Sequence, residues 1–184
     1  MKTLAALAAL CLAGCTAIDF QTVVVDSASP VGGADQLACP PTLADAQSCV
    51  TRVDARRWTS PTGVLMAAGQ AYCLTVLPDQ VWFDADRRHT PPQGEQGSWL
   101  MRLPTRRHDA PFFSLVANLV DRQGAVLAGA AQVVDAAQNF RFQATAQGEL
   151  VLYPNDALGP DVAPDFWYRN NAGAIWVRIA HCRR

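Results

Sequence analysis

The chain lacks a charge excess of either sign, because its 15 Lys and Arg residues nearly balance its 16 Asp and Glu residues. A nucleic-acid-binding surface needs clustered positive charge, so we expect no nucleic-acid partner. The sequence also has no Cys-x-x-Cys pair, no Gly-x-Ser-x-Gly motif and no glycine-rich phosphate loop. No two acidic residues are singled out for glycosidic chemistry. Together these absences predict a protein that is not an enzyme.

Long apolar runs are also scarce, and the only extended one lies at the start of the chain. It reaches from Leu4 to Ala13, follows Met1-Lys2 and precedes Gly14-Cys15. The run is too short to span a bilayer, which takes about 20 apolar residues. A positive start, a short apolar stretch and small residues before a break are typical of a secretory signal peptide, here residues 1–14.

Leu12-Ala13-Gly14-Cys15 resembles the lipobox of bacterial lipoproteins. The resemblance implies cleavage before Cys15, acylation of that residue and a lipid anchor in a membrane. Thr16 follows Cys15, where an aspartate would retain such a protein in the inner membrane. We therefore expect a cell-envelope lipoprotein of the outer membrane, facing the periplasm or the surface. The alternative is an ordinary signal peptide that is cut elsewhere, with Cys15 incidental.

Four cysteines remain after the signal and the anchor: Cys39, Cys49, Cys73 and Cys182. An even number in an exported chain predicts two disulfides, and three connectivities are possible. We favour Cys39–Cys49, which closes a short loop in a proline-rich segment, with Cys73–Cys182 tying an early strand to the last one. Metal ligation is the alternative, but these cysteines lack the spacing of a zinc site.

The rest of the chain divides into two parts. Residues 15–48 are rich in Ser, Gly and Pro, which predicts a lipid-anchored tether and an irregular lead-in. In residues 49–184, short apolar or alternating runs recur between turn residues, and this predicts an all-β, jelly-roll-like β-sandwich of about eight strands. The expected strands cover residues 63–67, 71–77, 80–84, 98–103, 112–120, 140–144, 149–153 and 174–181.

Two of these strands show a clear alternation. Ile175, Val177 and Ile179 share one face of the last strand, and Phe140 and Phe142 share one face of an earlier strand. Residues 112–120 are continuously apolar, which favours a central strand buried on both faces. A helix there is the alternative, since periodicity alone does not exclude it.

Two polar pairs near the C-terminus are the strongest candidate site. A strand delivers Asn155 and Asp156 to a loop, and the last strand begins just after Asn170 and Asn171. Amide and carboxylate oxygens suit a hard cation such as Ca²⁺. The alternative is turn chemistry, because Asn and Asp also hydrogen-bond their own backbone.

The pattern Tyr-x-Asn-Asp, a loop, Asn-Asn-x-Gly and a strand resembles the calcium-dependent galactose-binding bacterial lectins, which belong to the wider galactose-binding-like β-sandwich group. The resemblance spans about residues 53–181 and implies that Asp156, Asn170 and Asn171 ligate calcium. It implies that Asp156 and Asn170 also contact sugar hydroxyls. Gln93, before Gly94, matches a sugar-contacting glutamine, and His89 lies one residue from the family's sugar-contacting histidine.

The loop between the two polar pairs differs from that of these lectins. It is longer, contains no threonine and carries Phe166-Trp167-Tyr168. Trp167 and Tyr168 are candidates for an aromatic sugar platform beside the calcium site. Because an aromatic loop also suits a protein contact, the alternative is a structural or assembly lipoprotein that docks on an envelope protein without sugar or metal.

Overall fold

Alternating and continuous apolar strands build two antiparallel sheets in this computed structural model, which describes residues 39–45, 47–84, 90–95, 105–136, 139–158 and 166–182. Cys15 and His89 lie outside the described residues, as does the expected strand over 98–103. In the described ranges no helix is long and apolar enough to cross a membrane.

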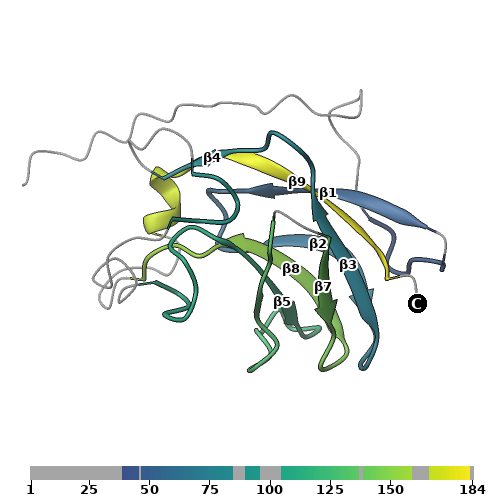
Figure 1. The fold of residues 1–184 in the computed structure, drawn as a ribbon. Coiled ribbons are helices and arrows are strands. Elements are labelled where there is room, and N and C mark those ends of the chain that lie inside the picture. The colour runs from purple at the N-terminus through teal and green to yellow at the C-terminus, as the bar shows by residue number, and fades with distance from the viewer. Residues whose placement is uncertain are drawn as a thin grey trace, which may run out of the picture.

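The two sheets face each other as a sandwich (Figure 1). The first sheet has the strand order β1-β9-β3-β7, with β4 paired to the start of β9, and the second has the order β2-β8-β5-β6. The strands are β1 (Ser48–Asp54), β2 (Ser60–Met66), β3 (Ala71–Val76), β4 (Trp82–Phe83), β5 (Leu115–Val120), β6 (Gln132–Val133), β7 (Phe140–Gln143), β8 (Gly148–Pro154) and β9 (Ala172–His181). The only helix in the described part is the short 3-10 helix η1 (Trp167–Asn170). The expected all-β sandwich is confirmed.

The core forms where the inward faces of the two sheets meet. Ile175, Val177 and Ile179 of β9 are buried, as the alternation predicts, and Phe142 of β7 is buried between exposed polar neighbours. All six residues of β5 are buried, and this strand lies between β8 and β6. The apolar run at residues 112–120 therefore forms a central strand and not a helix.

Two strands have no counterpart among the expected ones. β1 pairs along its whole length with β9. Only Thr51, Val53 and Asp54 of β1 are buried, so its apolar signal is weak. β6 has only two residues, too few to leave a pattern. The strand expected over 80–84 is reduced to Trp82–Phe83, because Pro78 and Asp79 form a turn before it.

The favoured disulfide pairing is confirmed, with bonds between Cys39 and Cys49 and between Cys73 and Cys182. Cys39 is buried, and the carbonyl of Pro41 accepts a hydrogen bond from Leu65 of β2. The segment from residue 39 is therefore packed on the sandwich.

The two disulfides close loops of very different length, since their cysteines are 10 and 109 residues apart. In the chain-entropy model, the longer loop stabilises the fold by about 2 kcal/mol more than the shorter one. We expect a Cys73→Ala/Cys182→Ala variant to lose more unfolding free energy in urea than a Cys39→Ala/Cys49→Ala variant. Equal losses would contradict this account.

Candidate functional site

The two polar pairs predicted near the C-terminus lie at one end of the sandwich. β8 ends at Pro154, which pairs with Leu115 at the start of β5, and β9 begins at Ala172, which pairs with Phe83 of β4. The loops that leave β8 and enter β9 therefore share the end that carries η1 (Figure 1). The turn after β1 joins them, because the amide of Ala55 donates to the carbonyl of Gly173.

Gly173 allows β9 to begin this close to its neighbours. Its φ is +84°, and a Cβ there would lie 3.3 Å from the Cα of Trp82. A larger residue would meet both backbone strain and the β4 backbone. The glycine of the Asn-Asn-x-Gly motif thus helps to fix where the chain enters β9 after Asn170 and Asn171.

Asn155 is a structural residue. Its Oδ1 accepts from the amide of Arg107 at 2.8 Å, and its Nδ2 donates to the carbonyls of Arg107 and Pro111 at 3.0 and 3.1 Å. Its backbone pairs with Phe113 and Ser114. The side chain is fully buried and its amide group is committed to holding the loop of residues 107–111.

Asp156 and Asn171 are in direct contact. The Nδ2 of Asn171 donates to Oδ2 of Asp156 at 2.8 Å and to the carbonyl of Ala55 at 3.0 Å, and the Oδ1 of Asp156 accepts from the amide of Ala157. Both side chains are nearly inaccessible, with exposed fractions of 2% for Asp156 and 1% for Asn171. The structure therefore brings together two of the three residues that the resemblance assigns to calcium, Asp156 and Asn171.

The Asp156 carboxyl is poorly compensated. Its pKa is raised from 3.8 to about 7, mainly by burial and also by the charge of Asp84, because the hydrogen bonds from Asn171 and Ala157 lower the pKa by less than burial raises it. In the described part of the chain, no basic side chain forms an ion pair with Asp156. A buried carboxylate without a cationic partner favours either a proton or a bound cation.

Two amide oxygens of the segment that contacts this carboxyl through Asn171 lack hydrogen-bond donors. The Oδ1 atoms of Asn170 and Asn171 are buried and have no partner among the residues that the structure describes. Buried acceptors without donors are rare, and a metal ion is one group that satisfies them. The described residues contain no group of three or more His, Cys, Asp or Glu side chains that could hold a metal. Calcium also accepts amide and carbonyl oxygens, so this donor set fits it.

Asp84 adds a second carboxylate at this end. It follows Phe83, whose ladder partner Ala172 comes directly after Asn171. The negative charge of Asp84 is one cause of the raised pKa of Asp156. The sequence places Asp84 at the end of the strand expected over 80–84 and does not nominate it as a site residue. The apolar pair Trp82-Phe83 was the available signal that a strand ends here.

The remaining sugar candidates are placed differently. Gln93 is exposed in a turn at the same end, where the carbonyl of Pro92 accepts from the amide of Leu115. Trp167 is half-buried in η1 and packs edge-on against Phe166. Tyr168 is fully buried, and its hydroxyl donates to the carbonyl of Pro154. Tyr168 thus offers no surface to a ligand, and we assign it a supporting role.

Arg106 lies between aromatic rings behind this site. Its guanidinium carbon is 3.7 Å from the ring centre of Trp58 and 3.6 Å from that of Tyr153. Its Nη1 donates to the carbonyl of Trp58, and its backbone amide donates to the carbonyl of Asp156. Trp58 in turn packs edge-on against Tyr168. No pattern in the sequence indicates this cluster, because its members come from four separate segments.

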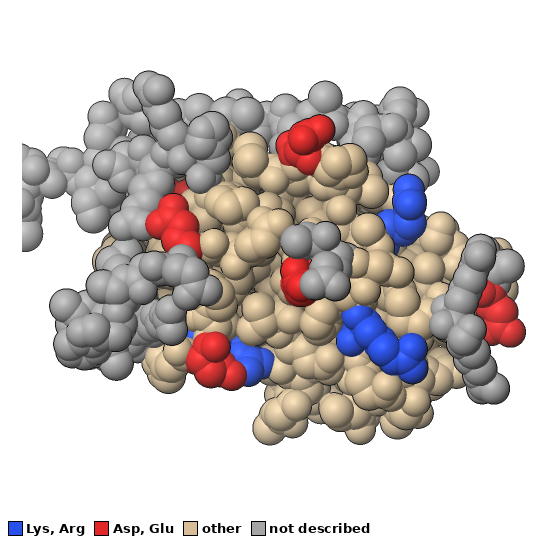
Figure 2. All heavy atoms as spheres, in the orientation of Figure 1, with Lys and Arg blue, Asp and Glu red and all other residues tan. Residues whose placement is uncertain are grey.

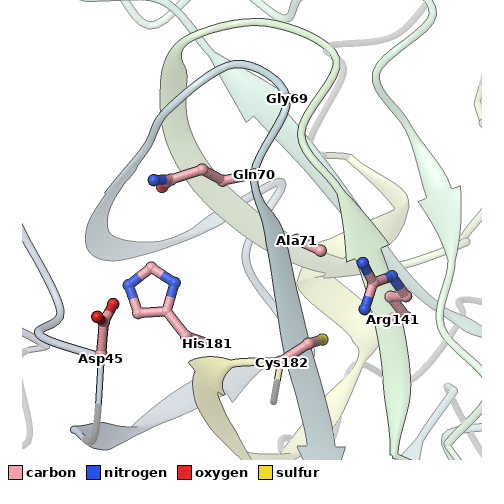
Figure 3. Close-up of a pocket in the computed structure, with 7 residues that line it drawn as sticks. All are labelled: Asp45, Gly69, Gln70, Ala71, Arg141, His181 and Cys182. Carbon is pink, nitrogen blue, oxygen red and sulfur yellow. The ribbon is translucent and has the colours of Figure 1, made fainter. Parts of the chain in front are cut away.

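A second hollow of about 600 Å³ lies where β9 ends and β3 begins (Figure 3). It is lined by polar and charged groups that include Asp45, Gln70, Arg141 and His181. His181 is already engaged, because its Nε2 lies 2.9 Å from the carbonyl oxygen of Leu43 and its ring packs on Tyr72. Cys182 of the predicted disulfides lines this hollow, but none of the predicted metal- or sugar-binding residues does. On the face shown in Figure 2, acidic and basic side chains of the described residues are scattered and form no continuous patch.

No family model and no curated protein matches this chain. A solved structure described as "EclA N-terminal domain; PllA-like lectin" is similar to it, with a TM-score of 0.47 and 23% identity over 72% of this chain and 95% of that one. The fold class rests on the strand pairing given above, and this likeness adds no residue assignment to it.

The raised pKa of Asp156 predicts how the metal-free domain responds to pH. Because the folded-state pKa of about 7 exceeds the ordinary value of 3.8, protonated Asp156 favours the folded state. This stabilisation is complete below the ordinary value and is lost as pH rises through about 7. We expect the unfolding free energy in EDTA to fall between pH 5 and 8 by urea denaturation.

The matched variant is Asp156→Asn, which is neutral at every pH. Its unfolding free energy should not show this decline, so the two pH profiles should diverge between about pH 4 and pH 7, the ordinary and the raised pKa of Asp156, and run parallel above that range. Profiles that are parallel at every pH would contradict the assignment of the raised pKa to Asp156.

Proposed function

We propose that this protein is a cell-envelope lipoprotein whose β-sandwich binds calcium at Asp156, Asn170 and Asn171 and recognises carbohydrate there. The observation that carries the proposal is a buried carboxylate, Asp156, in contact with Asn171, in a part of the chain where the described residues provide no cation for the carboxylate and no donor for the buried Oδ1 atoms of Asn170 and Asn171. A cation that prefers oxygen ligands would neutralise the carboxylate and would also coordinate the amide oxygens.

The residues present would supply part of a calcium shell. Asp156 would contribute carboxylate oxygen, Asn170 and Asn171 would contribute amide oxygens, and Asp84 lies beside them as a second carboxylate. Calcium takes about 6–8 oxygens, so these side chains leave positions for water or ligand hydroxyls. When bound, calcium would supply a positive charge to which oxygen atoms of sugar hydroxyls could coordinate.

Sugar recognition is supported by what surrounds the carboxylate. The resemblance to the calcium-dependent galactose-binding lectins implies that Asp156 and Asn170 contact sugar hydroxyls. It also matches Gln93 to a sugar-contacting glutamine and places His89 one residue from the family's sugar-contacting histidine. Gln93 is exposed at the same end of the sandwich, and half-buried Trp167 directly precedes the buried Tyr168 in η1. An indole ring can pack on the apolar face of a pyranose.

Calcium titration of residues 16–184, with both disulfides formed, tests the metal site. We expect saturable binding by calorimetry and a higher melting temperature in calcium than in EDTA. Asp156→Asn should weaken binding by at least about a hundredfold, since outer-shell changes alone cost about 10- to 100-fold. Asp84→Asn should weaken it by about tenfold, because it removes one charge beside the site.

The control is Asp121→Asn, which removes one carboxylate in a turn at the other end of β5. It should bind calcium as the parent does. Absence of binding at millimolar calcium, or equal binding by Asp156→Asn, would leave Asn170 and Asn171 as turn formers and overturn the proposal.

A glycan array probed in calcium and in EDTA tests the sugar. We expect retention on galactose-type glycans in calcium, loss of retention in EDTA, and loss with Asp156→Asn. Calcium binding without retention on any glycan would keep the metal site and remove the sugar. The protein would then be better explained by docking on an envelope protein.

The lipid anchor is proposed at Cys15, and labelling with a radioactive fatty acid in a bacterial host tests it. We expect the parent to carry label and to sediment with membranes, because acyl chains bury their methylene groups in the bilayer. Cys15→Ser should lose both properties. Cys11→Ser, changed within the signal, should keep both, and label retained by Cys15→Ser would refute the assignment.

A further inference from the structure

We infer that Arg106 is a positioning residue of the calcium site, and that it sets the separation between the Asp156 and Asn171 segments. The inference rests on the proposed function, and it concerns a residue outside the proposed ligand set. Arg106 is half-buried; it contacts the Asp156 segment directly and the Asn170–Asn171 segment through Trp58.

The first link runs from Arg106 to Asp156 through the backbone. The amide of Arg106 donates to the carbonyl of Asp156 at 3.0 Å, and the neighbouring Thr105 forms a bridge with Ala157. These contacts hold the short segment that carries the carboxylate. Movement of the 105–106 segment would therefore move Asp156.

The second link runs from the guanidinium to the strands. Its flat face is held between the rings of Tyr153, on β8, and Trp58, in the turn after β1. Tyr153 precedes Asp156 by three residues, and the turn after β1 includes Ala55, whose carbonyl accepts from Asn171. A planar guanidinium can stack on two rings and still donate in its plane, as it does to the carbonyl of Trp58.

The third link reaches η1. Trp58 packs edge-on against Tyr168, with ring centres 5.3 Å apart, and the hydroxyl of Tyr168 donates to the carbonyl of Pro154. Asn170 and Asn171 follow Tyr168 by two and three residues along the chain. The stack centred on Arg106 thus sets the position of both amide ligands relative to the carboxylate.

Charge alone predicts the opposite behaviour, which makes the inference testable. A fixed positive charge behind a cation site repels the cation, so its removal would strengthen calcium binding if electrostatics dominated. Replacement by lysine would then change nothing, because the charge stays. Positioning predicts weaker binding in both cases, since neither side chain reproduces the flat double stack.

The experiment measures calcium affinity by calorimetry for the parent, Arg106→Lys and Arg106→Gln at a temperature where all are folded. We expect both variants to bind about 10- to 100-fold more weakly. Trp58→Leu, which keeps the arginine and removes one ring face, should weaken binding in the same direction. Ile179→Val, a mild core change at the far end of β9, is the stability-matched control and should bind as the parent does.

Unchanged affinity in Arg106→Lys, or tighter binding in Arg106→Gln, would overturn the inference while leaving the proposed calcium site intact. If the parent binds no calcium, the proposed function is refuted instead. The positioning role of Arg106 is then tested by a measurement without metal. The Nδ2 protons of Asn171 should exchange at least about tenfold faster in Arg106→Lys by NMR, because their bonds to Asp156 and Ala55 loosen. Unchanged exchange, or equal acceleration in Ile179→Val, would rule out positioning.

Discussion

A carboxylate that is removed from water must be compensated, and the rest of this site depends on how Asp156 is compensated. Its two hydrogen-bond donors, the amide of Ala157 and the side chain of Asn171, do not cancel the effect of burial, because its pKa remains raised to about 7. Donation to Asp156 and to Ala55 uses the Nδ2 group of Asn171 and leaves its Oδ1 without a donor. An incompletely compensated acid and a buried acceptor without a described donor therefore belong to two side chains in contact, and this pairing is what supports the proposed cation position.

The sandwich positions these groups through strand ends. Asp156 follows the end of β8, and Asn171 directly precedes β9. Asp84 follows β4, whose two residues pair with the first residues of β9. Because the ladders fix each strand relative to its neighbours, the loops at this end begin from defined points even where their own contacts are few. The Cys73–Cys182 bond links the other end of β9 to β3. This covalent constraint therefore lies at the end of the sandwich opposite the candidate site.

The sequence allowed the fold class, the disulfide pairing and the meeting of Asp156 with Asn171 to be predicted, because each leaves a local pattern. Alternation marks β7 and β9, and two polar pairs that flank successive strands indicate one end of a sandwich. The sequence could not show that Asn155 holds a loop whereas Asp156 contacts Asn171. The partners that distinguish these two residues, Arg107 and Asn171, are distant from them in sequence. Tyr168 looks like an exposed aromatic in a loop sequence, yet the fold buries it completely.

Arg106 shows why residues behind a site are harder to find than its ligands. The positioning role proposed for Arg106 depends on two ring faces, from Trp58 and Tyr153, that are far from it in sequence. A positive charge near the proposed calcium position would repel the metal, and the contacts of the guanidinium with two ring faces and a carbonyl would reduce that repulsion. The stack can therefore fix the geometry of the carboxylate without neutralising it. A salt bridge in the same place would hold the loop equally well, but it would remove the negative charge that a bound metal requires.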